Sequence, residues 1–139
     1  MPKLALALHT TTPQLQLALG SFCQGEDLTI VEKIADLGKK SSGLVHIYLQ
    51  ELMTDRSWTD LVYVAVATGV GSFTGTRVGV VIARTLGQQL HIPVYGVACA
   101  EIDARTGEGS AVRKLLEIAH QRWCHQEPGD YKDVLPLYQ

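Results

Sequence analysis

A continuous apolar run, Leu61–Ala67 (LVYVAVA), constrains the fold of this chain more than any other feature. Such a run is typical of a strand that is buried on both faces of a parallel sheet. It leads into a glycine-rich segment, Thr68–Gly79 (TGVGSFTGTRVG), and apolar residues then recur at helical spacing over Gly75–Leu90. A second buried strand is predicted over Pro93–Ala98. Strand, helix and strand joined by short loops predict parallel pairing through a crossover helix.

The residues before this unit predict an antiparallel part of the same sheet. Lys3–His9 is short and apolar, Gln14–Gly20 alternates with leucine on one face, and Leu28–Ala35 is a third candidate strand. Their short, turn-rich connections favour antiparallel neighbours. Apolar spacing then predicts a helix over Ser41–Thr54. Three antiparallel strands followed by alternating helices and parallel strands is the order of the ribonuclease H-like fold, which the actin-like ATPase lobes share. The predicted class is therefore an α/β mixed sheet of this type.

The last third of the chain has a different character. The polar segment 101–110 (EIDARTGEGS) is predicted to be a linker, and the tail 125–139 is predicted to be extended. Between them, Ala111–Trp123 is predicted to be an amphipathic helix. Its apolar face consists of Val112, Leu115, Leu116, Ala119 and Trp123.

Composition narrows the functional classes. The net charge of −2 gives no electrostatic reason to expect direct binding of nucleic acid or of an anionic membrane. The cysteines Cys23, Cys99 and Cys124 are odd in number and widely spaced, which suits free thiols in a reducing compartment. No apolar stretch approaches membrane-spanning length. We therefore expect a cytoplasmic protein that does not bind a membrane.

The glycine-rich segment leaves two interpretations open. Gly69, Gly71 and Gly75 match neither the dinucleotide-binding fingerprint nor the Walker loop, but backbone amides at the start of a helix can bind an anion. Ser72 and Thr74 are residue types that cap helices. The segment is therefore either a phosphate-binding turn or only a tight turn between a strand and a helix.

The two helices of this region look too apolar for an outer side that faces solvent. Small residues recur every four positions in the second helix, beside a stripe of larger apolar residues, and such a row lets another helix approach closely. Either a partner packs on these helices or the residues belong to an ordinary core. The candidate interface residues are Val45, Tyr48, Leu49, Leu52, Gly75, Gly79, Ala83, Leu86 and Gly87.

The sequence offers no convincing catalytic set. Metal-dependent phosphate chemistry on this fold needs carboxylates near the ends of the first strands, whereas the first strand here ends in His9 and three threonines. His120, Cys124 and His125 are too few to predict a structural zinc site. We therefore expect no catalytic residues, no cofactor and no metal.

The segment TGVGSFTGTRVG, followed by VVIARTLGQQLHIPVYGV, closely resembles the signature G-x-G-P-G-S-F-T-G-x-R-x-G of the TsaB (YeaZ) family. The opening LALALHTTTPQLQLALG and the ending VLPLYQ are similar to the family's two ends. The resemblance implies an actin-like ATPase-type fold and a non-catalytic partner of the TsaD subunit. Their complex makes threonylcarbamoyladenosine at position 37 of tRNA. Members use two lobe helices to dimerise or to bind TsaD, so contact with tRNA is only indirect. The resemblance favours the interface interpretation, with Gly69, Gly71, Ser72, Phe73 and Thr74 as a structural glycine loop.

The sequence departs from the family in three ways. His9 stands where an aspartate is usual, and Val70 replaces a proline. The chain is also shorter than a typical member, so we expect a lobe over residues 1–104 and a remnant of the second lobe over 105–139. Two alternatives stay open: a homodimeric paralogue without a role in tRNA modification, and an actin-like-fold enzyme that acts on a phosphorylated ligand.

Overall fold

The computed structural model describes residues 2–23 and 27–137. Part of the predicted turn after the second strand and the last two residues of the tail lie outside this range. The strands are β1 (Lys3–His9), β2 (Gln14–Phe22), β3 (Thr29–Asp36), β4 (Leu61–Ala67) and β5 (Val94–Val97). The helices are α1 (Ser41–Leu52), α2 (Phe73–Leu90), α3 (Cys99–Ala104) and α4 (Ala111–Cys124), with short 3-10 turns at Gly38–Lys40, Trp58–Asp60 and Tyr131–Asp133. None of the helices in the described ranges is long and apolar enough to cross a membrane.

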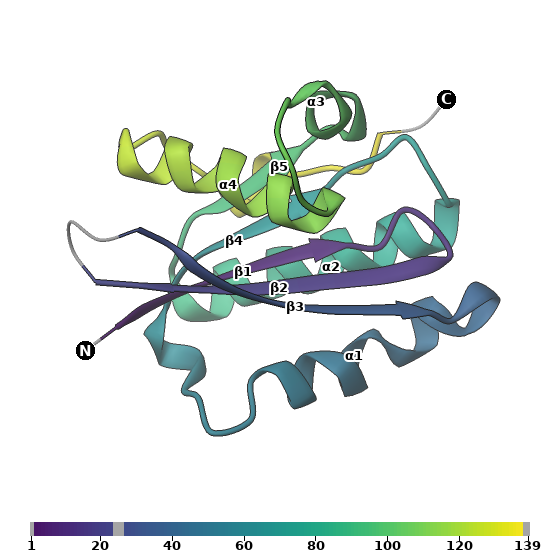
Figure 1. Ribbon diagram of the computed structural model, residues 1–139, viewed down its shortest axis with the longest axis horizontal. Coiled ribbons are helices and arrows are strands. Elements are labelled where there is room, and N and C mark those ends of the chain that lie inside the picture. The colour runs from purple at the N-terminus through teal and green to yellow at the C-terminus, as the bar shows by residue number, and fades with distance from the viewer. Residues whose placement is uncertain (1, 24–26, 138–139) are drawn as a thin grey trace.

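All five strands form one mixed sheet in the order β3-β2-β1-β4-β5 (Figure 1). The pairs β1–β2 and β2–β3 are antiparallel, and β4 is parallel to both β1 and β5. The predicted fold class and the predicted pairing directions are therefore confirmed. Because β1 and β4 are parallel neighbours, the turns that follow them lie next to each other at the same end of the sheet.

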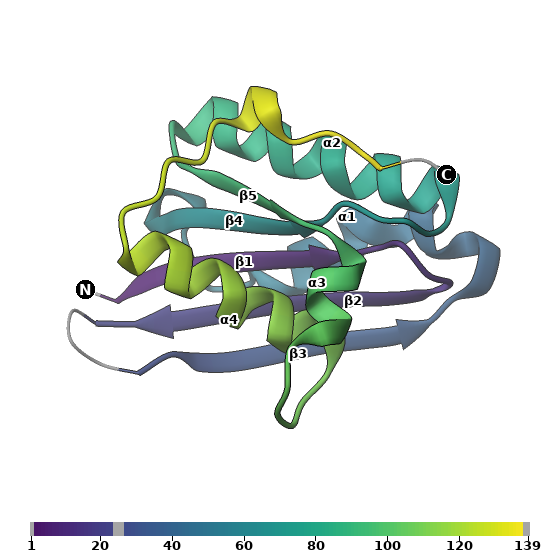
Figure 2. The same cartoon turned by 90° about the horizontal axis from the view of Figure 1, so that it is seen from above.

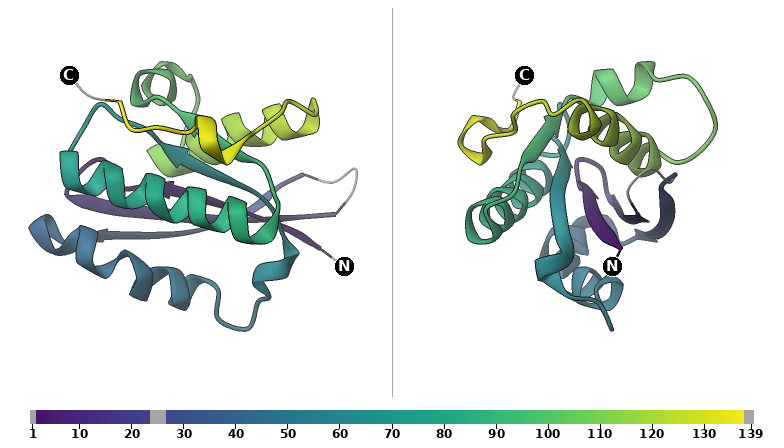
Figure 3. Two further views of the ribbon diagram at one scale, coloured as in Figure 1. Left: turned by 180° about the vertical axis from the view of Figure 1, so that it is seen from behind. Right: turned by 90° about the vertical axis from the view of Figure 1, so that its left-hand side faces the viewer.

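The two faces of the sheet differ in side-chain size. Leu6, Leu8 and Val66 belong to the face that packs on α1 and α2. Ala7 and Ala65 belong to the other face, which packs on α4. Because side chains alternate along a strand, β1 and β4 supply large residues to one face and mostly alanine to the other. Small side chains let a helix lie close to the sheet, and Figure 3 shows the helices on its two sides.

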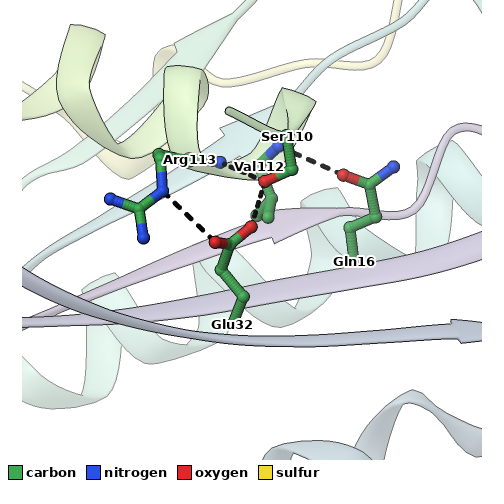
Figure 4. A network of polar contacts seen from close by, with 5 residues as sticks. All are labelled: Gln16, Glu32, Ser110, Val112 and Arg113. Carbon is green, nitrogen blue, oxygen red and sulfur yellow. Dashed lines mark hydrogen bonds and ion pairs between the residues drawn. The ribbon is translucent and has the colours of Figure 1, made fainter. Parts of the chain in front are cut away.

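A polar network fixes the start of α4 on the sheet (Figure 4). Ser110 caps the helix by accepting from the Arg113 amide at 3.2 Å, and its hydroxyl donates to Glu32 of β3. Arg113 Nε donates to the same carboxylate at 3.2 Å. The Val112 amide donates to Gln16 Oε1 of β2 at 3.1 Å. Two free amides of the first helical turn are thus satisfied, one of them by a side chain of the sheet.

The apolar face of α4 is buried on the sheet, as the sequence predicts. Leu115 and Leu116 have no exposed surface, and Trp123 is partly buried against the same cluster. Helix α4 therefore shares the core of the sheet. The assignment of residues 105–139 to the remnant of a second lobe stays a prediction.

Two predictions about the last third need correction. The predicted linker 101–110 begins inside α3, because Ile102 is fully buried in the cluster that it shares with α4 and Glu101 forms an ion pair of 2.7 Å with Arg122. The predicted extended tail contains the 3-10 turn at Tyr131–Asp133. The tail runs along the edge of β5 beside α2 (Figure 2). There, main-chain bonds join Val94 to Gly129 and Leu137 to Thr68, at 3.0 and 2.7 Å.

Candidate partner-binding surface and glycine loop

The glycine loop joins β4 to α2 and packs against the turn between β1 and β2. Ser72 is the N-cap of α2, and its hydroxyl accepts from the Gly75 amide at 3.3 Å. The Ser72 amide donates to the Thr11 carbonyl at 2.6 Å. Gly69 has a φ of 108°, which other residues rarely adopt. These contacts are those of a structural turn, while Ser72, Phe73 and Thr74 remain exposed at its tip.

The row of small residues in α2 faces the sheet of the same chain. A β-carbon on Gly75 would collide with the Thr10 carbonyl, one on Gly79 with Thr10 Oγ1, and one on Gly87 with Val94. Ala83 has no exposed surface. In this chain the space around these four residues is filled by its own sheet, and their contact with a partner stays a prediction. They are small because the helix lies directly on the sheet.

The predicted residues of α1 are also largely internal. Val45, Leu49 and Leu52 are at most 5% exposed and belong to the core beneath the helix. Tyr48 and, in α2, Leu86 are partly buried and pack against the same core. The predicted list thus identifies the inner faces of two neighbouring helices. A partner must bind to residues on their outer side.

The outer side of α2 carries exposed apolar residues that the predicted interface list lacks or assigns to the loop. Phe73 is 58% exposed and Val81 is 60% exposed. The Arg77 guanidinium lies 5.0 Å from the centre of the Phe73 ring. A hollow of about 360 Å³ lies among six residues, which we call the α2 patch: Phe73, Thr74, Arg77, Val78, Val81 and Ile82. Val81 was detectable from the sequence, because it is a large apolar residue on the arc opposite the small ones.

β1 ends in His9, where metal-dependent phosphate chemistry on this fold would use a carboxylate. His9 is 5% exposed, and its Nδ1 lies 3.4 Å from Thr11 Oγ1, which is also 3.4 Å from Cys99 Sγ. Burial lowers the pKa of His9, and the charge of Asp103 opposes this lowering. At neutral pH the ring is therefore uncharged. A neutral imidazole beside a hydroxyl and a thiol is not the oxygen-rich site that Mg²⁺ prefers.

Among the candidate zinc ligands, His120 and Cys124 do meet. His120 Nε2 lies 3.5 Å from Cys124 Sγ, and Nδ1 lies 3.0 Å from the Tyr63 hydroxyl. Burial lowers the pKa of His120. Within residues 2–23 and 27–137, no three histidine, cysteine or acidic side chains come together as a metal site requires.

A family model described as TsaD, tRNA N6-adenosine threonylcarbamoyltransferase, matches residues 39–114, which is more than half of the chain. The chain belongs to this family. A relative from Bacillus subtilis, named tRNA threonylcarbamoyladenosine biosynthesis protein TsaB, is 36% identical over 104 residues. A relative of the same name from Buchnera aphidicola is 37% identical over 60 residues. The matches cover 73% and 43% of this chain but 44% and 29% of the relatives, so the chain spans less than half of their length. The resemblance to TsaB (YeaZ) is confirmed.

Solved structures agree on the fold. A Pseudomonas aeruginosa protein, described as similar to the peptidase YeaZ, superposes with a TM-score of 0.79 at 15% identity, and the match covers 98% of this chain and 99% of that one. Thermus thermophilus RuvC superposes with a TM-score of 0.57 at 11% identity, over 88% and 96% of the two chains. At such identities the likeness shows the shared ribonuclease H-like fold alone.

Proposed function

We propose that the chain is a non-catalytic subunit in the modification of tRNA to threonylcarbamoyladenosine at position 37, and that it binds a TsaD-like subunit in the cytoplasm. The exposed α2 patch is the observation that supports this proposal most directly. Phenylalanine and arginine are enriched at protein interfaces, and here the Arg77 guanidinium lies over the exposed Phe73 ring beside a hollow. Contact with tRNA is then made through the complex, which agrees with the net charge of −2.

Family membership supports the pathway, and the end of β1 supports the absence of catalysis. The proposed complex needs one active site, which the TsaD-like subunit supplies. This chain has a buried, neutral His9 where the fold would hold a carboxylate for metal-dependent chemistry. Its contribution is therefore to bind and position the catalytic subunit.

The patch supports a test that separates binding from folding. Val81→Glu places a carboxylate in the middle of the proposed interface, one helical turn after Arg77, and the cost of removing such a pair of charges from water can exceed their attraction. We expect the affinity for the TsaD-like protein of the same organism, measured by calorimetry, to fall by at least about tenfold. Gln121→Glu adds the same charge at an exposed position on α4, on the other face of the sheet, and is expected to bind like the unchanged chain. If both variants are folded and bind equally well, the α2 patch is not the interface.

The same patch also suits a second copy of this chain, which is the main alternative. Light scattering on the isolated protein distinguishes the two cases. A stable dimer that Val81→Glu dissociates, together with no binding of the TsaD-like protein, would favour the homodimer. A monomer that forms a one-to-one complex favours the proposed role.

A further inference from the structure

A second hollow adjoins the α2 patch, on the side where the tail runs beside α2 (Figure 2). Its volume is about 370 Å³, and we call it the arginine hollow. The α2 residues that line it include Arg77, Val81, Arg84 and Gln88, and the tail contributes Tyr131. None of the described residues that line it is acidic. Because Arg77 and Val81 also line the α2 patch, the two hollows form one continuous surface.

The two arginines of α2 differ from other arginines of the chain in their partners. Neither Arg77 nor Arg84 forms an ion pair with a described residue. The Arg77 guanidinium lies over the Phe73 ring, and Arg84 Nη1 donates to the Val134 carbonyl at 3.3 Å. Three other arginines each form an ion pair with a glutamate of the same chain: Arg105, Arg113 and Arg122. Helix α2 itself contains no acidic residue, so its two positive charges have no counterpart on the helix.

The spacing of these residues fits a helical partner. Arg77, Val81 and Arg84 are four and three residues apart, so they lie on one side of α2. The two arginines are separated by about 10 Å along the helix axis, at about 1.5 Å per residue. Val81, which is 60% exposed, lies between them. A helix that lies along α2 can meet all three with a carboxylate, an apolar residue and a second carboxylate.

The charges do not suit a second copy of this chain. Helices α1 and α2 together contain one carboxylate, that of Glu51, which already forms an ion pair of 2.7 Å with Lys33. Two copies that met through these helices would therefore bring their arginines together without an unpaired carboxylate between them, and like charges across an interface disfavour a partner. The phosphates of a nucleic acid could pair with arginine, but the net charge of −2 and the exposed Phe73 and Val81 favour a protein.

We propose that the arginine hollow and the α2 patch receive an acidic helix of a different protein. Its carboxylates pair with Arg77 and Arg84, on either side of an apolar side chain that covers Val81. The inference rests on the proposed function, in which this protein is the TsaD-like subunit, and it specifies the chemistry of that subunit's contact surface. Such complementary charges raise the rate of association and select the partner.

A change of sign at one position tests the proposal. Gln88 is exposed and lines the arginine hollow. At low salt, Gln88→Lys should raise the association rate with the TsaD-like protein of the same organism by about threefold, and Gln88→Glu should lower it by about as much. Both effects should shrink at high salt, because exposed charges are then screened. A residue that acts only on folding would not give opposite effects for opposite charges.

Loss of one arginine charge provides the second measurement. Arg84→Gln should weaken the affinity for the TsaD-like protein by about tenfold. Lys114→Gln removes the same charge from α4, on the other face of the sheet, and should leave the affinity unchanged. Because Arg84 also holds the tail through the Val134 carbonyl, its variant can lose stability, and the Gln88 pair decides the matter in that case.

The outcomes separate this inference from the proposed function. Binding that does not respond to salt, to the sign of the charge at Gln88 or to Arg84→Gln would overturn the acidic helix and leave the proposed function standing. No binding of the unchanged chain would overturn both. Transfer RNA that binds the isolated chain and is released by Arg84→Gln would also overturn the inference, because the arginines would then face phosphates.

Discussion

The substitution Gly79→Ala distinguishes the two interpretations of the small residues in α2 by the sign of its effect. On an outer helical surface, alanine in place of glycine stabilises a helix by roughly 1 kcal/mol. In this structure the new methyl group would collide with Thr10 Oγ1 and approach Val66 Cγ2 at 3.6 Å. Crowding of a packed core costs typically 1–3 kcal/mol.

A further loss arises because Thr10 is already engaged. Its hydroxyl donates to the Gly75 carbonyl at 2.7 Å, and moving it away weakens a buried hydrogen bond worth about 1 kcal/mol. The crowding and the lost bond exceed the gain in helix propensity. We therefore expect Gly79→Ala to lower the free energy of unfolding by about 1–3 kcal/mol, measured by urea denaturation.

Gly43→Ala is the matched control. It makes the same change in α1, where no atom lies within 4 Å of the new β-carbon, so it should stabilise the protein by about 0.5–1 kcal/mol. In a double-mutant cycle, Thr10→Ala should remove much of the penalty of Gly79→Ala, because the colliding oxygen is gone. If Gly79→Ala stabilises the protein as Gly43→Ala does, the helix does not lie on the sheet as described here.

Three other substitutions test the core, the pH dependence and the docking of α4. Leu116→Ala should cost about 2–5 kcal/mol in urea unfolding, because the side chain is fully buried, whereas exposed Leu135→Ala should change stability by less than about 0.5 kcal/mol. Burial lowers the pKa of His9 below its ordinary value near 6.5, so below that pH the unfolded chain binds more protons than the folded chain. The free energy of unfolding therefore decreases as the pH falls, and at pH 5.5 His9 accounts for a decrease of at most about 1.4 kcal/mol. His9→Gln should flatten this part of the stability curve, and an unchanged slope would contradict the assignment. Glu32→Gln should cost about 1 kcal/mol at low salt and less at high salt, and equal costs at both would show that its ion pair with the start of α4 contributes little.

Most of the fold could be predicted from the sequence because segments with the period of a strand, two residues, and segments with the period of a helix, about 3.6 residues, are well separated along the chain. The leucines of Gln14–Gly20 alternate with a period of two and Leu61–Ala67 is apolar throughout, whereas apolar residues recur at helical spacing over Gly75–Leu90, so strands and helices can be told apart before any contact is known. The helix α3 could not be predicted in this way. It has a single fully buried residue, Ile102, in a polar segment, and one residue has no period. Its helical form depends on packing against α4, which only the tertiary structure provides.

The candidate surface was harder to predict, because small residues show that another group lies close but not which group it is. A row such as Gly75, Gly79 and Ala83 indicates that something approaches the helix closely, but it does not indicate whether that is a partner or the chain's own sheet. Here Thr10 of the turn after β1 is that neighbour, and its contact depends on two segments far apart in sequence. The opposite arc of the same helix was the more informative one. Solvent gives no reason for Phe73 and Val81 to be large and apolar there, so an exposed apolar residue on a polar arc is better evidence for a partner than a buried row of glycines.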